Sequence, residues 1–269
     1  MAKTVFVDGD PSTGVQGTVV DAAFLNAIFA HRHDGLNQDG SALPVSPVGL
    51  TIKNNAVTPN TQMDIAFYSD IQKQNTVTVT ADITVNGAAG LDTGAQAASS
   101  WYHMHAIINT ATGALSAVFS LSATSPTLPA GYAYYAYLGA VYSDAASHFI
   151  AIFQVGNKVA RVPVSNVVSG GNFLVYTSVT VRGQIVAPLT ANVVRGTVTL
   201  TFSGNGGAGV WVAADANGSD SQECRFYNSG GAGAVFACPF RMMLTGNNIY
   251  HETDTANATY AISVSGWEY

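Results

Sequence analysis

Residues 101–153 read WYHMHAIINTATGALSAVFSLSATSPTLPAGYAYYAYLGAVYSDAASHFIAIF, and this stretch decides the fold class. It is made of β-branched, aromatic and small residues, interrupted by turn-forming clusters at NTATG, SPTLPAG and SDAAS. This punctuation predicts four strands in meander order, near 101–108, 115–121, 132–142 and 147–154.

The same stretch carries almost no charge. Between Gln74 and Asn157 the chain has no Lys or Arg, and Asp144 is the only acidic residue in the stretch that contains the four predicted strands. Such strands are usually covered on at least one face, so we expect a second sheet or another chain to lie against them.

The composition of the whole chain also favours strands. Of the 269 residues 10% are charged, against about 25% in a typical protein. Gly, Ala, Ser, Thr and Asn replace the missing charges, and these short side chains suit strands and turns better than long helices. The sequence therefore predicts a mostly β protein.

Beyond residue 153, short strands recur with turn signals between them, which is the rhythm of a β-sandwich. We expect one antiparallel, jelly-roll-like sandwich over residues 61–269. Two smaller sandwiches, divided near Gly170–Gly171, are the alternative. The further predicted strands are KVARVPV, FLVYTSVTV, VVRGTVTLTF, GVWVAA, ECRFYN, AVFACPF, NIYHE and YAISVSGW.

Residues 1–60 read differently. TVVDAAFLNAIFAHRHDG, residues 18–35, predicts a short helix with Thr18 as its N-cap and Gly35 just beyond its end. Residues 36–64 hold three prolines and no periodicity, which indicates an extended arm. The helix would dock either on the chain's own β core or on a neighbouring subunit or larger particle. Its apolar stripe consists of Phe24, Leu25, Ile28 and Phe29.

Charge and motifs exclude several functions. The formal charge is −6 and the ten cationic residues are scattered, so nucleic-acid binding is not expected. No apolar run reaches the ~18 residues of a membrane-spanning helix, and the N-terminus does not read as a secretory signal, so we expect synthesis in a cytoplasm. GxSxG, HExxH and CxxC motifs are absent, so we do not expect the protein to be an enzyme. Solvation is the expected role of the carboxylates near predicted strand ends, Asp215, Asp220, Glu223, Glu252 and Asp254.

The two cysteines lie in CRFYNSGGAGAVFAC. Cys224 and Cys238 are symmetric about Gly231, as are Phe226 and Phe236, which predicts a hairpin closed by a Gly-rich loop. A disulfide across such a hairpin is geometrically conceivable but strained. Because synthesis in a cytoplasm is expected, we favour two free, buried thiols.

Several segments resemble bacteriophage proteins. The helix followed by HRHDGLNQDGSALP is similar to the start of many tail-fibre and tail-associated proteins. SSWYHMHAIIN, AVFSLSATSPTLPAGYAYYAYLGAVYSD and the ending YAISVSGWEY resemble a module of phage and prophage fibre proteins. Together these segments cover about two thirds of the chain.

This resemblance implies a non-enzymatic virion component, commonly a homotrimer. Its N-terminal part would attach to other tail or baseplate proteins, and its C-terminal β domain would contact polysaccharide or protein on the host surface. The chain is short for a fibre, which leaves a collar, baseplate or head appendage as the alternative. A polysaccharide depolymerase is a more distant one.

Four histidines form two HxH units. On a strand, His103 and His105 would face the same side, and three chains around an axis would supply six nitrogens for a transition metal. Hydrogen-bonded imidazoles on one strand face are the alternative. His31 and His33 would more simply cap the C-terminus of the predicted helix. Otherwise we expect no cofactor.

Aromatic residues are the better candidates for a ligand surface, because flat rings with a polar edge stack on sugars. The alternation in YAYYAY equally places its rings in a core or at a subunit interface, and we favour that role. The candidate rings are Trp211, Trp267, Tyr132, Tyr134, Tyr135 and Tyr137.

Overall fold

The computed structural model describes residues 49–68, 76–202, 204–228 and 234–269. Within these ranges the chain forms strands and no helix, and nearly all strand pairs are antiparallel, so the mostly β prediction is confirmed. The expected N-terminal helix lies outside the described residues. This applies to Phe24, Leu25, Ile28, Phe29, His31 and His33.

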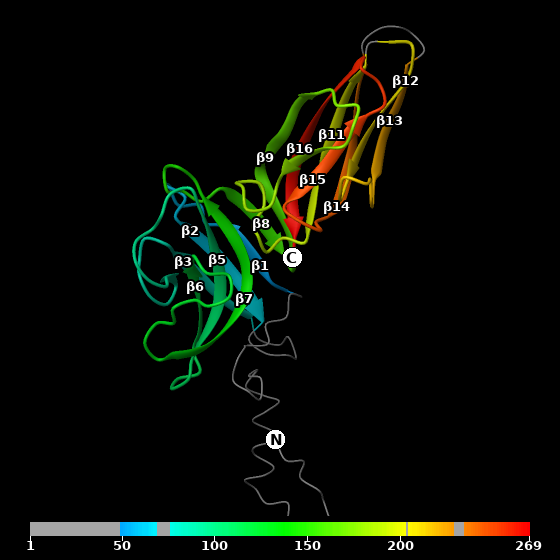
Figure 1. The fold of residues 1–269 in the computed structure, drawn as a ribbon. Coiled ribbons are helices and arrows are strands. Elements are labelled where there is room, and N and C mark those ends of the chain that lie inside the picture. Colours follow the sequence, from blue (N-terminus) through cyan, green and yellow to red (C-terminus); the bar gives the residue numbers. More distant parts are fainter. Residues whose placement is uncertain (1–48, 69–75, 203, 229–233) are drawn as a thin grey trace, which may run out of the picture.

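One eight-stranded sheet runs through the whole body (Figure 1). Its strands alternate between inward apolar and outward polar positions, as in β2, where every second residue is buried. In spatial order they are β14 (Ala234–Met243), β11 (Val193–Phe202), β16 (Ala258–Glu268), β9 (Lys158–Gly171), β8 (Ala151–Val155), β1 (Thr51–Asn54), β2 (Gln62–Tyr68) and β3 (Thr76–Asp82).

Two four-stranded sheets cover the two halves of this large sheet and so create two lobes (Figure 1). The N-terminal lobe adds β4 (Gly90–Leu91), β6 (Leu115–Ser120), β5 (Ser100–Asn109) and β7 (Tyr132–Ser143), in that order. The C-terminal lobe adds β10 (Thr177–Thr180), β15 (Asn248–Thr253), β12 (Gly206–Ala213) and β13 (Gln222–Asn228). All pairs are antiparallel except β4 with β6.

The predicted meander is wrong in its order. Three of its strands, β5, β6 and β7, lie within about a residue of the predicted bounds. However, β7 pairs with β5 rather than with β6, and β8 leaves for the eight-stranded sheet. Strand β5 therefore lies between β6 and β7 and is buried over Tyr102–Ile107.

Strand β1 falls within the segment expected to be a linker. It pairs with β2 on one side and β8 on the other, and Ile52 is fully buried. The linker expected up to residue 60 therefore contributes an interior strand to the β body.

The β8–β9 turn joins the two ends of the described body at the waist between the lobes. The amide of Gly156 donates to the carbonyl oxygen of Leu50, just before β1, at 2.8 Å. The amide of Tyr269 donates to the carbonyl oxygen of Asn157 at 3.1 Å. The chain thus enters and leaves the body at one place, and the far tips of both lobes point away from it (Figure 1).

The two cysteines form a disulfide, which corrects the expectation of free thiols. Cys224 and Cys238 have Cα atoms 5.6 Å apart. The predicted hairpin is also wrong, because β13 lies at the edge of one sheet and β14 at the edge of the other. The symmetry nevertheless holds: the rings of Phe226 and Phe236 stack at 5.6 Å. The bridge therefore ties two facing sheets together at their open edge.

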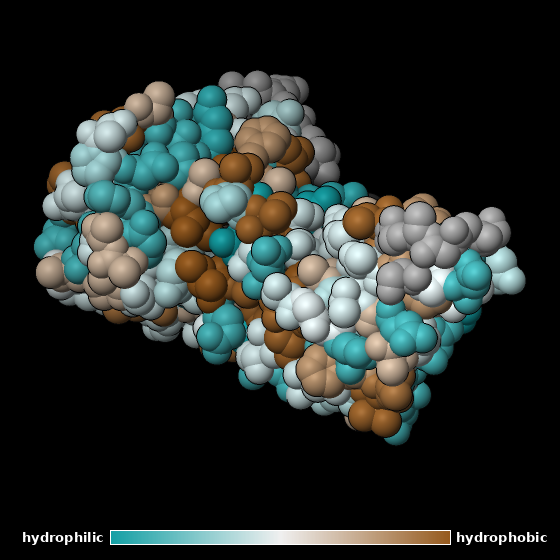
Figure 2. Space-filling view, turned by 90° about the horizontal axis from the view of Figure 1, so that it is seen from above, coloured by the Kyte–Doolittle hydropathy of each residue, from teal (hydrophilic) through white to brown (hydrophobic). Residues whose placement is uncertain are grey.

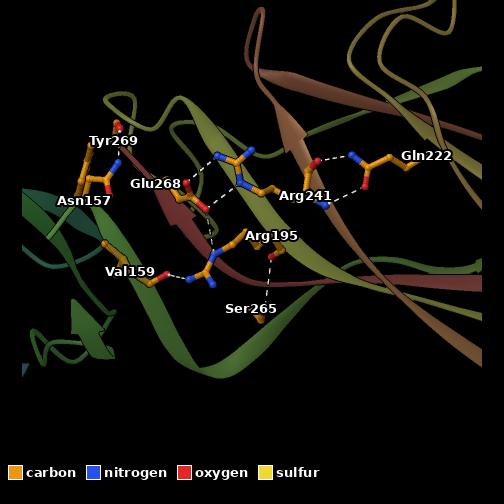
Figure 3. A network of polar contacts seen from close by, with 8 residues as sticks. All are labelled: Asn157, Val159, Arg195, Gln222, Arg241, Ser265, Glu268 and Tyr269. Carbon is orange, nitrogen blue, oxygen red and sulfur yellow. Dashed lines mark hydrogen bonds and ion pairs between the residues drawn. The ribbon is translucent and has the colours of Figure 1, made fainter. Parts of the chain in front are cut away.

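A second link between these edges is polar (Figure 3). The Glu268 carboxylate is buried, and it accepts hydrogen bonds from Arg241 Nε and Nη2 at 3.0 and 2.8 Å. These bonds hold the pKa of Glu268 below its usual range. Gln222 of β13 accepts from the backbone amide of Arg241 and donates to its carbonyl. One cluster thus connects β16 and β14 of the large sheet with β13 of the small one.

Candidate functional site

The outer face of the β4-β6-β5-β7 sheet is covered by the chain itself. His103 and His105 share this face of β5, as the two-residue spacing predicts, and both are buried. His105 Nε2 lies 3.0 Å from the carbonyl oxygen of Ser122, and its ring contacts Tyr135 and Tyr137 edge-on. Hydrogen-bonded imidazoles on one strand face, the alternative to a metal site, describe this arrangement.

Burial keeps these imidazoles neutral. Desolvation, followed by the neighbouring His105, lowers the pKa of His103 to about 4. Desolvation also lowers the pKa of His105. Both rings contact Tyr137 within the chain, whereas His105 Nδ1 is buried without a hydrogen-bond partner among the described residues.

The last strand completes the cover over this face. Trp267 is fully buried and meets Trp101 edge-on at 5.5 Å between ring centroids. The Tyr269 hydroxyl accepts from the amide of Ala140 at 2.6 Å, and its ring packs on Tyr137. The segment between β10 and β11 adds two contacts: Thr190 bonds the Tyr137 hydroxyl, and the Gln184 carbonyl accepts from Trp101. The four tyrosines of YAYYAY are half-buried, and Tyr135 and Tyr137 pack on His105.

The outer face of the β10-β15-β12-β13 sheet is, by contrast, open. Inward positions such as Val210, Val212 and Ile249 are fully buried, whereas most of the alternate positions carry polar, charged or aromatic side chains with solvent access. Gly209 and Ala213 are buried although they face outward. None of these outward positions on the four described strands holds Leu, Ile, Val or Met. They are Ser178, Thr180, Gly207, Gly209, Trp211, Ala213, Glu223, Arg225, Tyr227, Asn248, Tyr250 and Glu252.

One row across this face alternates aromatic and carboxylate side chains. Trp211 is paired with Glu252 on one side and Glu223 on the other. Tyr176 directly precedes β10, whose Thr177 pairs with His251, so Tyr176 lies beside Glu252 at the end of this row, with its ring against Gly218 of the β12–β13 loop. Burial, followed by the Glu252 charge, raises the pKa of the Tyr176 phenol. Strands lie about 4.8 Å apart, so Tyr176 and Trp211 stand about 10 Å apart along the row.

An ion-pair network fixes the next row. Arg225 pairs with Glu223 on its own strand and reaches Asp254 at 3.1 Å. Its guanidinium also lies over the Trp211 ring at 5.3 Å. The path to Asp254 crosses Gly209, where a Cβ would lie 2.8 Å from Trp211 and 3.0 Å from Arg225. Glycine at 209 therefore lets the indole and the guanidinium lie against the sheet.

The face ends at a small polar cavity of about 130 Å³. Tyr250, two residues from Glu252 on β15, forms one of its walls, and Asp215 lies opposite on the β12–β13 loop. That loop is held by Asp215, whose carboxylate accepts from the amides of Asn217 and Ser219. The other lining residues are Ala214, Thr245, Gly246, Asn247 and Asn248.

The sequence predicted part of this site. Trp211, Glu223, Glu252 and Asp254 were candidates, but nothing in their spacing brought them onto one face. Arg225, Tyr176 and Tyr250 were missed, although the alternation in ECRFYN and NIYHE could have placed two of them outward. Trp267, proposed beside Trp211 as a sugar-stacking ring, lies in the core instead.

Within the described residues, no group of three or more His, Cys, Asp and Glu side chains is arranged to hold a metal ion. The same part of the chain contains no helix long and apolar enough to cross a membrane.

No protein-family model matches the chain. No curated protein matches it either.

Proposed function

We propose that this protein is a non-enzymatic component of a bacteriophage virion, a tail-fibre or receptor-binding protein that contacts the host surface through its C-terminal lobe. The observation that carries the proposal is the placement of the two ends of the described body, Leu50 and Tyr269, at the Gly156–Asn157 turn. A body held there projects both lobe tips away from its anchor, as an attachment protein requires. The resemblance of the N-terminal segment to phage tail proteins supports the same direction of attachment.

The layered β body fits this role. Two lobes of facing sheets, of which the C-terminal one is closed at one edge by a disulfide, form the kind of β-sandwich that we expect at the exposed end of such an appendage. We further propose that the jelly-roll-like character expected from the sequence belongs to these lobes, and that the N-terminal segment carries the helix that docks on the virion.

A homotrimer is part of the proposal. The outer face of the large sheet exposes apolar side chains at the waist: Phe153 and Val155 on β8 and Val162 on β9 are 52%, 50% and 66% exposed. The register places Phe153 beside Ala160 and Val162 beside Ala151, so these side chains share one face. Space-filling representation also shows hydrophobic residues gathered where the lobes meet (Figure 2). Sister copies would cover this face.

Charge substitution tests the subunit contact. Val162→Lys should shift the full-length protein from trimer to monomer in light scattering, because burying a lysine against a sister copy is unfavourable. Val235→Lys is the matched control, since Val235 is 69% exposed but lies on β14, away from the waist. A monomeric parent protein, or equal effects of both variants, contradicts the proposed contact.

Two measurements test the function. Gold-labelled antibodies against the protein should bind the tail of purified virions in electron microscopy, and absence of label from the particle refutes the proposal. Purified full-length protein should block adsorption of the phage to its host. Tail, collar or head labelling without blocked adsorption would instead establish a purely structural component. Release of reducing sugar from host polysaccharide would establish a depolymerase.

A further inference from the structure

We propose that the open face of the β10-β15-β12-β13 sheet binds an uncharged glycan along the row Tyr176, Glu252, Trp211 and Glu223. The inference rests on the proposed function and names the class of host-surface molecule that this lobe contacts.

The first argument is the chemistry of the row. A pyranose ring presents an apolar face of C–H groups and a rim of hydroxyls, so it needs a flat ring to stack on and acceptors beside that ring. Trp211 supplies the ring, and the carboxylates of Glu223 and Glu252 stand directly across from it on the two neighbouring strands. Carboxylates accept hydrogen bonds from hydroxyls strongly, because the acceptor is charged.

The second argument is spacing. Tyr176 and Trp211 lie about 10 Å apart with Glu252 midway. Two stacking rings at that separation suit alternate units of an extended sugar chain, with the central carboxylate bonding hydroxyls of the unit between them. The polar cavity beside Tyr250 offers Asp215, Asn247 and Asn248 to a branch or a hydroxymethyl group.

The third argument separates a glycan from a protein partner. Protein interfaces need a desolvated apolar centre, but no outward position on these four described strands carries an aliphatic side chain larger than Ala. The exposed aliphatic residues of the body lie outside these strands, as at Val155 and Val162 on the large sheet and at Leu174 and Val175 before β10. A surface of aromatic rings, carboxylates and glycines is suited to a hydroxylated ligand.

Charge decides between neutral and anionic glycans. The face holds Glu223, Glu252 and Asp254 against one cation, Arg225, which two of these carboxylates already engage. An anionic polysaccharide would meet net repulsion without a free cation to pair with.

The fourth argument is the rigidity of the row, because the Trp211 side chain is already held in place before a ligand binds. The edge of the Trp211 indole lies against Gly209, and the Arg225 guanidinium, which is held by its ion pairs, lies over the ring. A ring fixed before the ligand arrives loses little conformational entropy on binding.

The test uses the full-length protein and five probes: cellohexaose, maltohexaose, laminarihexaose, chitohexaose and, as the anionic comparison, polygalacturonate. We expect at least one neutral oligosaccharide to bind in titration calorimetry and to change tryptophan fluorescence. Trp211→Ala should weaken that binding at least about tenfold, because it removes the stacking ring. Glu252→Gln should weaken it less, since the amide oxygen still accepts.

Tyr227→Ala is the matched control. Tyr227 is 75% exposed on the same face, but it pairs with Gly207, beyond the Arg225–Asp254 ion pair and outside the row. The control should bind like the parent protein.

The inference is overturned if no neutral probe binds at about 10 mM, the weak end of specific recognition, if polygalacturonate binds better, or if Trp211→Ala binds like the parent. Blocked adsorption without neutral-glycan binding would leave the proposed function standing and refute only this ligand class. Neutral-glycan binding without blocked adsorption would support this ligand class and refute the proposed function in host attachment.

Discussion

The two four-stranded sheets of this protein differ in what lies against their outer faces. On the β4-β6-β5-β7 sheet, β5 and β7 carry histidines and tyrosines that the last strand and the segment before β11 cover. On the β10-β15-β12-β13 sheet, the outward positions include Glu223, Arg225 and Glu252 and stay open. Both faces are aromatic, so aromatic content does not separate them. Charged side chains separate the two faces, because a buried charge needs a partner and the described residues of the covered face of the β4-β6-β5-β7 sheet supply none.

The largest expected difference between the faces concerns their tryptophans. Trp267→Ala removes a fully buried indole from between the lobes and should lower the free energy of unfolding by about 3–5 kcal/mol. Trp211→Ala, on the open face, should cost less than about 1 kcal/mol. Urea denaturation followed by far-ultraviolet circular dichroism measures both. A similar loss of unfolding free energy in the two variants would contradict the description of one face as covered and the other as open.

The disulfide gives the next effect, confined to the C-terminal lobe. Cys224 and Cys238 are 14 residues apart in sequence, so reduction should lower the free energy of unfolding by about 3 kcal/mol. Dithiothreitol should therefore lower the melting temperature of the parent protein in calorimetry. The Cys224→Ser/Cys238→Ser double variant should have the lower melting temperature without dithiothreitol, and dithiothreitol should not change it. A parent melting temperature that is insensitive to dithiothreitol contradicts the bridge.

Acid should weaken the covered face next. His103 and, inside the other lobe, His251 have folded pKa values of about 4, both through desolvation, against about 6.5 in an unfolded chain. The unfolded chain takes up protons between these values and the folded protein does not, so stability is complete above pH 6.5 and falls as pH drops towards 4. Between pH 7 and pH 5.5 the two residues together should cost about 2 kcal/mol.

Denaturant midpoints across that pH range check this expectation. His103→Gln should show a shallower pH dependence than the parent protein, because it removes one of the histidines whose pKa is lowered by burial. An unchanged parent midpoint between pH 7 and pH 5.5 would show that these imidazoles are protonated as readily when folded as when unfolded.

The smallest effect belongs to the ion pairs of the open face. Arg225 and Glu223 are 49% and 40% exposed, so solvent screens their attraction. Arg225→Ala should leave the melting temperature nearly unchanged and should loosen Trp211, visible as greater quenching of tryptophan fluorescence by acrylamide. A large loss of stability on this substitution would mean that the open face is structural.

The sequence predicted strands better than their arrangement. Alternation and turn clusters located β5, β6 and β7 closely, because both are local properties. The pairing of β7 with β5 and the departure of β8 to another sheet depend on contacts that no local pattern encodes. The meander was therefore the natural but wrong choice.

The candidate site shows the same division. Symmetry about Gly231 correctly brought Cys224 near Cys238, but a hairpin and two facing sheet edges predict the same proximity, so the sheet assignment failed. Likewise, alternation put His103 and His105 on one face, but only the fold shows that the C-terminal strand covers them. Trp211 and Trp267 were indistinguishable by sequence, because each stands in an alternating strand.

The interior position of β1 has a mechanical consequence. Any force that reaches the β body through the backbone before Gly49 acts on a strand hydrogen-bonded along both sides, to β2 and to β8. Pulling along that strand loads its ladders in shear, so several bonds must break together instead of one after another. The same sheet then passes the load through β8 and β9 to β16 in the second lobe. Tension is thus shared by one continuous sheet instead of by a hinge between two separate domains.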